Sequence, residues 1–155
     1  MARRGFTLLE LVLALVLLAL GTGLATASLA GLRDGAAAGD AAERLVLLGE
    51  RARRLAVHEG APVRLRIDPE AATAALAVLR PEGEAASGDP LALGEPGRLA
   101  ISAGTGTDLL FLPDGRCDSP GTVIVDQGGW RRQVRFPAGA LPPIASPAED
   151  AEATP

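Results

Sequence analysis

The sequence predicts an α+β protein in which a long N-terminal helix packs on a small, mostly antiparallel β-sheet. Three observations lead to this prediction. An apolar stretch near the amino terminus covers residues 11–32, and a segment with helical periodicity follows it up to residue 60. From residue 63 onward, apolar and polar residues alternate in short runs that glycine and proline separate. Helical periodicity followed by strand periodicity is typical of α+β folds.

The apolar stretch is long enough to cross a membrane. Residues 11–32 carry no charged side chain, and as a helix they would extend about 33 Å, slightly more than a hydrocarbon core. Together with the residues just before it, this stretch predicts a transmembrane helix at residues 6–32. Glu10 lies at the edge of the stretch, where a buried carboxylate is costly unless another group neutralises it.

An amphipathic continuation of the helix is predicted at residues 33–60. Its apolar side chains recur at steps of three and four residues and form one stripe. The stripe comprises Leu45, Leu48, Ala52 and Leu55. Gly60 and Pro62 end the helix. The residues alone leave open whether 33–39, which contain two glycines, are helical or partly melted.

A β-rich globular domain is predicted at residues 61–141. Its strands are predicted at residues 63–67, 74–80, 108–112, 122–126 and 130–136. Turn residues within the first pair and within the last pair predict two hairpins. Closely spaced glycine and proline predict a long exposed loop at residues 81–98, and the aperiodic, acidic residues 142–155 predict a disordered tail. The aromatic residues of this domain, Phe111, Trp130 and Phe136, are predicted to share its core.

The composition narrows the possible functions. Acidic residues outnumber basic ones, 19 to 15, so a general affinity for nucleic acid is not expected. The single cysteine, Cys117, cannot form an internal disulfide and is predicted to be a packing residue. The single histidine, His58, has no further ligands at usable spacing, so no metal site is predicted. No catalytic set or phosphate-binding loop is apparent, and neither a cofactor nor an enzymatic activity is predicted.

The first ten residues, MARRGFTLLE, resemble the class III signal of type IV pilins and type II secretion pseudopilins. In that signal a short basic leader ends in glycine before Phe-Thr-Leu-Leu-Glu. The matching residues are Arg3, Arg4, Gly5, Phe6, Thr7 and Glu10. The resemblance implies that residues 1–5 are a leader peptide, recognised through its arginines. A prepilin peptidase would cleave between Gly5 and Phe6 and methylate the new amino terminus on Phe6.

The same resemblance implies a role for Glu10 in filament assembly. Its carboxylate would pair with the charged amino terminus, on Phe6, of a neighbouring subunit, which would offset the desolvation cost of both charges. The alternative is a carboxylate that extends toward lipid headgroups and has no role. For the whole segment, the alternatives are a plain signal anchor or conventional secretion with cleavage near Ala27, although signal peptidase sites follow shorter apolar stretches.

Up to residue 142 the chain resembles the GspH/FimT-like minor pilins and pseudopilins. An arginine-rich helix end at residues 51–56 precedes a strand, and residues 110–115 read LFLPDG, similar to a Phe-x-Pro-Asp-Gly motif of this branch. The last predicted strand, with its arginines, also fits. The branch often closes with a Thr-Gly-Arg-like turn, whereas residues 136–140 of this chain read FPAGA.

The resemblance implies a non-enzymatic minor pseudopilin, a structural subunit of the type II secretion pseudopilus involved in protein secretion across the outer membrane. Its partners would be the prepilin peptidase, other pseudopilins in a filament, the inner-membrane secretion platform and membrane lipid. It would cross the inner membrane once, with the amino terminus cytoplasmic and the C-terminal domain periplasmic, since basic residues stay on the cytoplasmic side.

The alternative function is that of a minor pilin of a type IV pilus that binds DNA for uptake. The candidate DNA contacts are Arg131, Arg132 and Arg135. On a strand, Arg131 and Arg135 share one face and Arg132 points to the other, so at most two of the three arginines line up.

Overall fold

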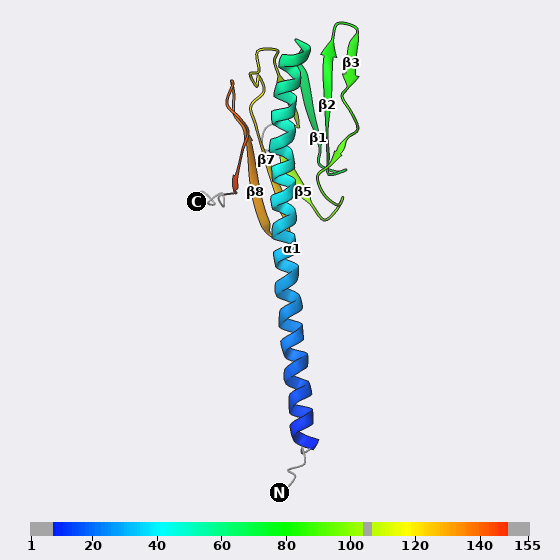
Figure 1. Cartoon of the computed structure of the whole chain (residues 1–155), viewed down its shortest axis with the longest axis vertical. Coiled ribbons are helices and arrows are strands. Elements are labelled where there is room, and N and C mark those ends of the chain that lie inside the picture. The colour runs from blue at the N-terminus through cyan, green and yellow to red at the C-terminus, as the bar shows by residue number, and fades with distance from the viewer. Residues whose placement is uncertain (1–7, 104–106, 149–155) are drawn as a thin grey trace, which may run out of the picture. The chain divides into compact units, whose positions relative to one another are not determined.

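The computed structural model describes residues 8–103 and 107–148, except for the side chains of residues 21, 23–30 and 103. The chain divides into two compact units, Met1–Arg33 and Asp34–Pro155. Helix α1 (Leu8–Glu59) begins in the first unit and ends in the second, and all strands belong to the second (Figure 1).

In the first unit, the described residues form the first part of α1. Its large apolar side chains between Leu8 and Leu20 are exposed, with Leu8 at 83%. Among the residues that the structure describes, no helix is both long enough and apolar enough to cross a membrane. The span predicted at residues 6–32 includes residues 6 and 7 and the side chains of residues 21 and 23–30, which lie outside the description.

In the second unit, α1 presents a stripe of small and aliphatic side chains to the core. The buried members are Ala38, Ala41, Ala42, Leu45, Leu48, Ala52 and Ala56. Residues 34–39, left open by the sequence, are helical. The predicted stripe is confirmed except at its end, where Ala56 is buried and Leu55 only half-buried. Gly60 ends the helix with a φ of +60°, a left-handed conformation that glycine adopts without steric cost.

The strands form two antiparallel sheets, where the sequence predicted one. The first sheet has the order β3-β2-β1-β6, and β4 also pairs with β2. Its strands are β1 (Val63–Asp68), β2 (Thr73–Arg80), β3 (Gly83–Ala86), β4 (Leu91–Ala92) and β6 (Asp108–Phe111). The second sheet has the order β5-β7-β8-β9. Its strands are β5 (Ala100–Ala103), β7 (Gly121–Gln127), β8 (Trp130–Phe136) and β9 (Ile144–Pro147).

Both predicted hairpins are present. In the first, β1 pairs with β2, with Leu65 opposite Leu76, and Asp68 Oδ1 accepts hydrogen bonds from the backbone N–H groups of Glu70 and Ala71, both at 3.0 Å. In the second, β7 pairs with β8 across a two-glycine turn. An aspartate that accepts from the residues after it stabilises a tight turn, so the local sequence is sufficient to define the first hairpin.

Two predictions of irregular structure were wrong. The predicted loop at residues 81–98 contains β3 and β4, and the predicted disordered tail at residues 142–155 contains β9, paired with β8. The side chains of β3 and β9 are all exposed, so these strands lack the apolar alternation that reveals a strand in a sequence. Main-chain hydrogen bonds to a neighbouring strand form them instead. Residues 149–155 lie outside the described part of the chain.

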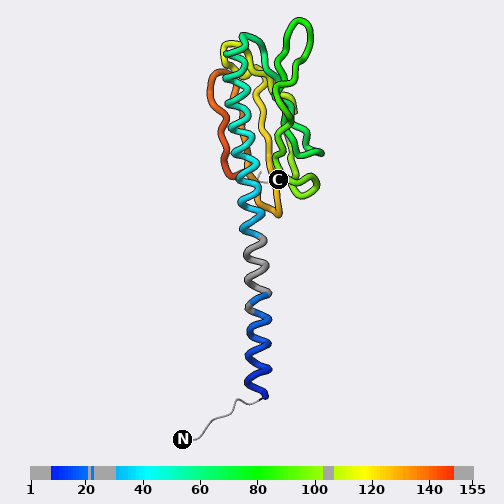
Figure 2. Tube along the Cα trace, turned by 45° about the vertical axis from the view of Figure 1, so that its right-hand side comes forward, coloured from blue at the N-terminus to red at the C-terminus, as the bar shows by residue number. Residues whose placement is uncertain are grey.

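One hydrophobic core joins the second part of α1 to both sheets. Its largest buried side chains include Phe136 of β8, Leu65 of β1 and Leu45 of α1. The two views agree that this part of the helix runs beside the strands (Figure 2). The packing holds the β7–β8 turn and the edge strand β9 next to α1, where the candidate sites lie.

Candidate functional site

The residues predicted to direct processing are at the amino-terminal end. Arg3, Arg4, Gly5 and Phe6 lie outside the described residues. Glu10 is described and lies in the first turn of α1, between the exposed side chains of Leu9 and Leu11. A carboxylate in the first turn of a helix interacts favourably with the helix dipole. The roles of all five residues in processing and assembly remain predictions.

Strand β8 places its three arginines on two faces. Arg132 lies on the same side of the strand as the buried Val134 and Phe136, and Arg131 and Arg135 lie on the opposite side. The Nε of Arg131 donates to Asp126 Oδ2 at 2.8 Å. The three candidate DNA contacts therefore do not form one basic surface, and a carboxylate partly neutralises one of them.

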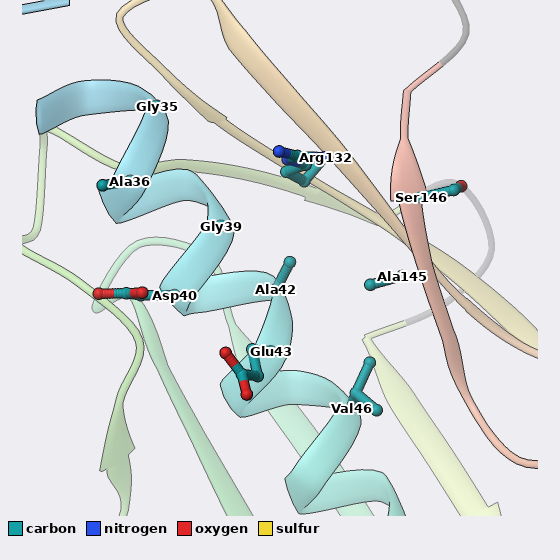
Figure 3. A pocket seen from close by; sticks show the side chains of 10 residues that line it. All are labelled: Gly35, Ala36, Gly39, Asp40, Ala42, Glu43, Val46, Arg132, Ala145 and Ser146. Atoms are coloured by element: carbon teal, nitrogen blue, oxygen red, sulfur yellow. The ribbon is translucent and has the colours of Figure 1, made fainter. Parts of the chain in front are cut away.

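A surface hollow of about 510 Å³ opens between α1 and the β8–β9 edge of the second sheet (Figure 3). It is lined by Gly35, Ala36, Gly39, Asp40, Ala42, Glu43, Val46, Arg132, Ala145 and Ser146. The side chain of Arg132 extends toward the helix turn of Gly35 and Gly39, while the carboxylates of Asp40 and Glu43 are directed away from it (Figure 3). Six of the ten lining residues are glycine, alanine or serine.

Cys117 and His58, the single cysteine and the single histidine of the chain, are not placed together in a site. Cys117 is buried, and its Sγ donates to the carbonyl oxygen of Ser119 at 3.4 Å. Burial raises the pKa of the Cys117 thiol, which disfavours the reactive thiolate, so its predicted packing role fits this environment. His58 is exposed in the last turn of α1. Within residues 8–103 and 107–148, no three histidine, cysteine or acidic side chains gather where they could hold a metal ion.

Sequence reasoning misplaced Trp130, which is 51% exposed and not part of the core. Its ring lies against α1 at Gly35, where an added Cβ would be only 3.1 Å from Trp130 Cδ2. Next to it, Gln127 Nε2 donates to Asp34 Oδ1 at 3.2 Å. Gly35 is the sequence feature that could have indicated this contact, because a glycine within a helix allows a close approach to its backbone.

The amino-terminal segment matches a known family model. Residues 1–26 match the prokaryotic N-terminal methylation motif. This match agrees with the resemblance of the first ten residues to a prepilin signal. No curated protein sequence matches the chain significantly.

Several solved structures share the fold of the chain. The minor pseudopilin EpsH from the type 2 secretion system of Vibrio cholerae aligns with a TM-score of 0.59 at 16% identity, over 74% of this chain and 96% of that one. The solution structure of E. coli GspH aligns with a TM-score of 0.60 at 17% identity, over 76% and 93%. The type IV minor pilin FimU of Pseudomonas aeruginosa aligns with a TM-score of 0.59 at 17% identity, over 71% and 88%.

At these identities the structural likeness establishes the fold, an N-terminal helix packed on antiparallel sheets. The methylation motif adds independent information, because it lies in the sequence ahead of the aligned strands. The methylation motif at residues 1–26 and the shared fold together support the resemblance of the chain to type IV pilin-like proteins of the GspH/FimT type.

Proposed function

We propose that the chain is a minor pseudopilin, a structural subunit of the type II secretion pseudopilus that takes part in protein secretion across the outer membrane. One observation carries the proposal: the methylation motif at residues 1–26 leads into a helix whose large apolar side chains are exposed from Leu8 to Leu20. Exposed apolar surface costs about 25 cal/mol per Å² in water. Membrane lipid and the helices of other pseudopilins would cover this surface.

The first test is processing. We expect a prepilin peptidase to recognise Arg3 and Arg4, cleave between Gly5 and Phe6 and methylate Phe6. The full-length protein is expressed with and without the peptidase, extracted from membranes, and analysed by intact mass and amino-terminal sequencing. A methylated Phe6 terminus that requires the peptidase supports the proposal. An intact Met1 terminus in both samples, or cleavage near Ala27, contradicts it.

Glu10 provides a test of assembly that is separate from processing. If its carboxylate pairs with the amino terminus of a neighbouring subunit, Glu10→Val is still cleaved but enters filaments poorly, because the partner charge is left unpaired in an apolar environment. Glu10→Gln is the matched control for shape, and it should show a similar defect. Incorporation of either variant at the level of the native protein would exclude the charge pair.

The proposed location is the inner membrane, crossed once, with the amino terminus cytoplasmic and the C-terminal domain periplasmic. The basic residues Arg3 and Arg4 ahead of the apolar stretch support this orientation. Further partners would be the inner-membrane secretion platform and the surrounding lipid. Protease added to spheroplasts should digest the C-terminal domain, and protection of that domain would reverse the proposed orientation.

The likeness to the type IV minor pilin FimU favours one second candidate, a minor pilin of a type IV pilus. Deletion of the gene distinguishes the two machines: loss of protein secretion supports the first, and loss of surface pili supports the second. The DNA-uptake version places arginines of the set Arg131, Arg132 and Arg135 on phosphates. Because at most two of them share a face of the strand, log affinity should fall with log salt with a slope of about −2. If DNA binding is absent, or does not weaken with salt, the DNA-uptake hypothesis is refuted.

A further inference from the structure

The tip of the second hairpin carries a large aromatic side chain that the fold holds at the surface. Trp130 follows the β7–β8 turn and packs on one side against the backbone of α1 at Gly35, while 51% of its surface stays exposed. An exposed tryptophan costs free energy in water, because its ring is mostly apolar. Its indole N–H also needs a polar partner.

The turn is fixed in place by several polar contacts. Gln127 Nε2 donates to Asp34 Oδ1 at 3.2 Å, and the backbone N–H of Gly129 donates to Asp126 Oδ1 at 3.2 Å. Gly128, with a φ of +58°, lies so close to Asp34 that an added Cβ would be 2.6 Å from its Oδ2. These contacts hold Trp130 against the helix, where it cannot turn into the core.

Chain connectivity places this tryptophan close to the end of the predicted membrane span. The span ends at residue 32, and Trp130 contacts residue 35. Three residues reach at most about 11 Å even when fully extended, whatever path they take. The polar headgroup layer on each side of a bilayer is roughly 5–8 Å thick. Trp130 is therefore within reach of that layer if residues 6–32 cross the membrane.

Charge at the turn is compatible with a phospholipid surface. Asp34 accepts a hydrogen bond from Gln127, and the ion pair with Arg131 offsets the charge of Asp126. A further arginine, Arg132, lies two residues after Trp130 in the chain. Tryptophan is enriched at membrane interfaces, where its apolar ring and polar N–H are both satisfied, and arginine interacts favourably with anionic headgroups.

From these observations we propose that the β7–β8 turn contacts the phospholipid headgroup layer through Trp130. The contact would set the depth at which the globular unit meets the membrane surface. The inference rests on the proposed function, because it requires residues 6–32 to be a membrane anchor.

The test uses the full-length protein reconstituted into phosphatidylethanolamine and phosphatidylglycerol vesicles. Trp130 is the only tryptophan of the chain, so fluorescence reports on this residue alone. Lipids that carry a nitroxide quencher at the headgroup or deep in the acyl chain measure its depth, and iodide measures its access to water. We expect a blue shift of the emission relative to detergent, reduced iodide quenching, and stronger quenching by the headgroup probe than by the deep probe.

A matched variant moves the reporter along the same helix. Val57 is 56% exposed and lies about 33 Å beyond Gly35 along α1. In Trp130→Phe/Val57→Trp, the new tryptophan should be quenched by iodide and by neither lipid probe. Equal lipid quenching in this variant and the native protein would overturn the proposal, as would strongest quenching of Trp130 by the deep probe.

Flotation of the vesicles separates failure of this inference from failure of the proposed function. If the protein does not float with the vesicles, the membrane anchor itself is wrong and the proposed contact is wrong with it. If the protein floats but Trp130 is quenched only by iodide, the anchor stands and the headgroup contact is refuted.

Discussion

Two glycines of α1 allow a direct test of how closely the helix packs on the second sheet. A Cβ added at Gly49 would lie 2.7 Å from Cε1 of Phe136 and 2.9 Å from Cγ of Pro143. A Cβ added at Gly39 would meet no atom within 4 Å. The same substitution, glycine to alanine, should therefore leave the protein less stable when it is made at Gly49 than when it is made at Gly39.

The magnitudes follow from helix propensity and from packing. Alanine is about 1 kcal/mol more favourable than glycine in a helix interior, so Gly39→Ala should stabilise the protein by up to that amount. Gly49→Ala has the same gain but forces an extra methyl group against Phe136, which is 1% exposed and enclosed by the core. Such overpacking costs about 1–3 kcal/mol. The two variants should differ in unfolding free energy by that cost.

The assay is urea unfolding of the full-length protein in detergent micelles, followed by the emission of Trp130. With a denaturant slope of about 1–3 kcal/mol per M, each 1 kcal/mol moves the midpoint by roughly 0.3–1 M. We expect Gly39→Ala to unfold at higher urea than the native protein and Gly49→Ala at lower urea than Gly39→Ala. Equal midpoints for the two variants would refute the close approach of α1 to Phe136.

Three further predictions concern individual side chains of the second unit. Burial raises the pKa of the Cys117 thiol, so its contribution to stability is present below the pKa of an unfolded thiol, about 8.5, and is lost as pH rises through the folded value. Iodoacetamide should alkylate Cys117 more slowly in the native protein than in urea, and equal rates would contradict its burial. The backbone N–H of Arg116 lowers the pKa of Asp114, so this carboxylate stabilises the fold above about pH 3.9 and loses its effect as pH falls through the folded value. An NMR titration of Asp114 with a midpoint at or above the unfolded value would show that the hydrogen bond is absent. Asp68→Ala removes the acceptor of two backbone hydrogen bonds and should cost about 1 kcal/mol in urea unfolding, while Asp68→Asn should cost less. Equal losses in both variants would mean that the side-chain oxygen is not what stabilises the turn.

Most of the regular elements that bury one face could be predicted from the sequence. Strand β5 was not predicted, although its Ile101 is buried in the core. Helix α1 and strands β1, β2, β6, β7 and β8 each contribute side chains to the core, so the period of their apolar residues identifies them. The α+β fold class follows from the order of these elements and is confirmed by the likeness to known pseudopilin structures. Strands β3 and β9 escaped prediction because their side chains are exposed and their pairing depends on the backbone alone.

Some features of the candidate sites could likewise be predicted from the sequence, and others could not. The methylation motif at residues 1–26 was recognisable from the sequence, because it is a linear pattern of residues. The separation of Arg131 and Arg135 from Arg132 followed from strand periodicity, but the pairing of Arg131 with Asp126 did not. Trp130 was assigned to the core on the strength of its size, and the structure places it at the surface.

By itself, the sequence determined the amino-terminal motif, the apolar stretch, the order of helix and strands, and the turn at Asp68, since each depends on residues close together in the chain. The tertiary structure decided the division of the strands into two sheets, the hollow beside α1, and the position of Trp130 against Gly35. Each of these depends on contacts between residues far apart in the chain. Which surfaces meet is set by the packing of the whole core, and no local pattern of residues encodes it.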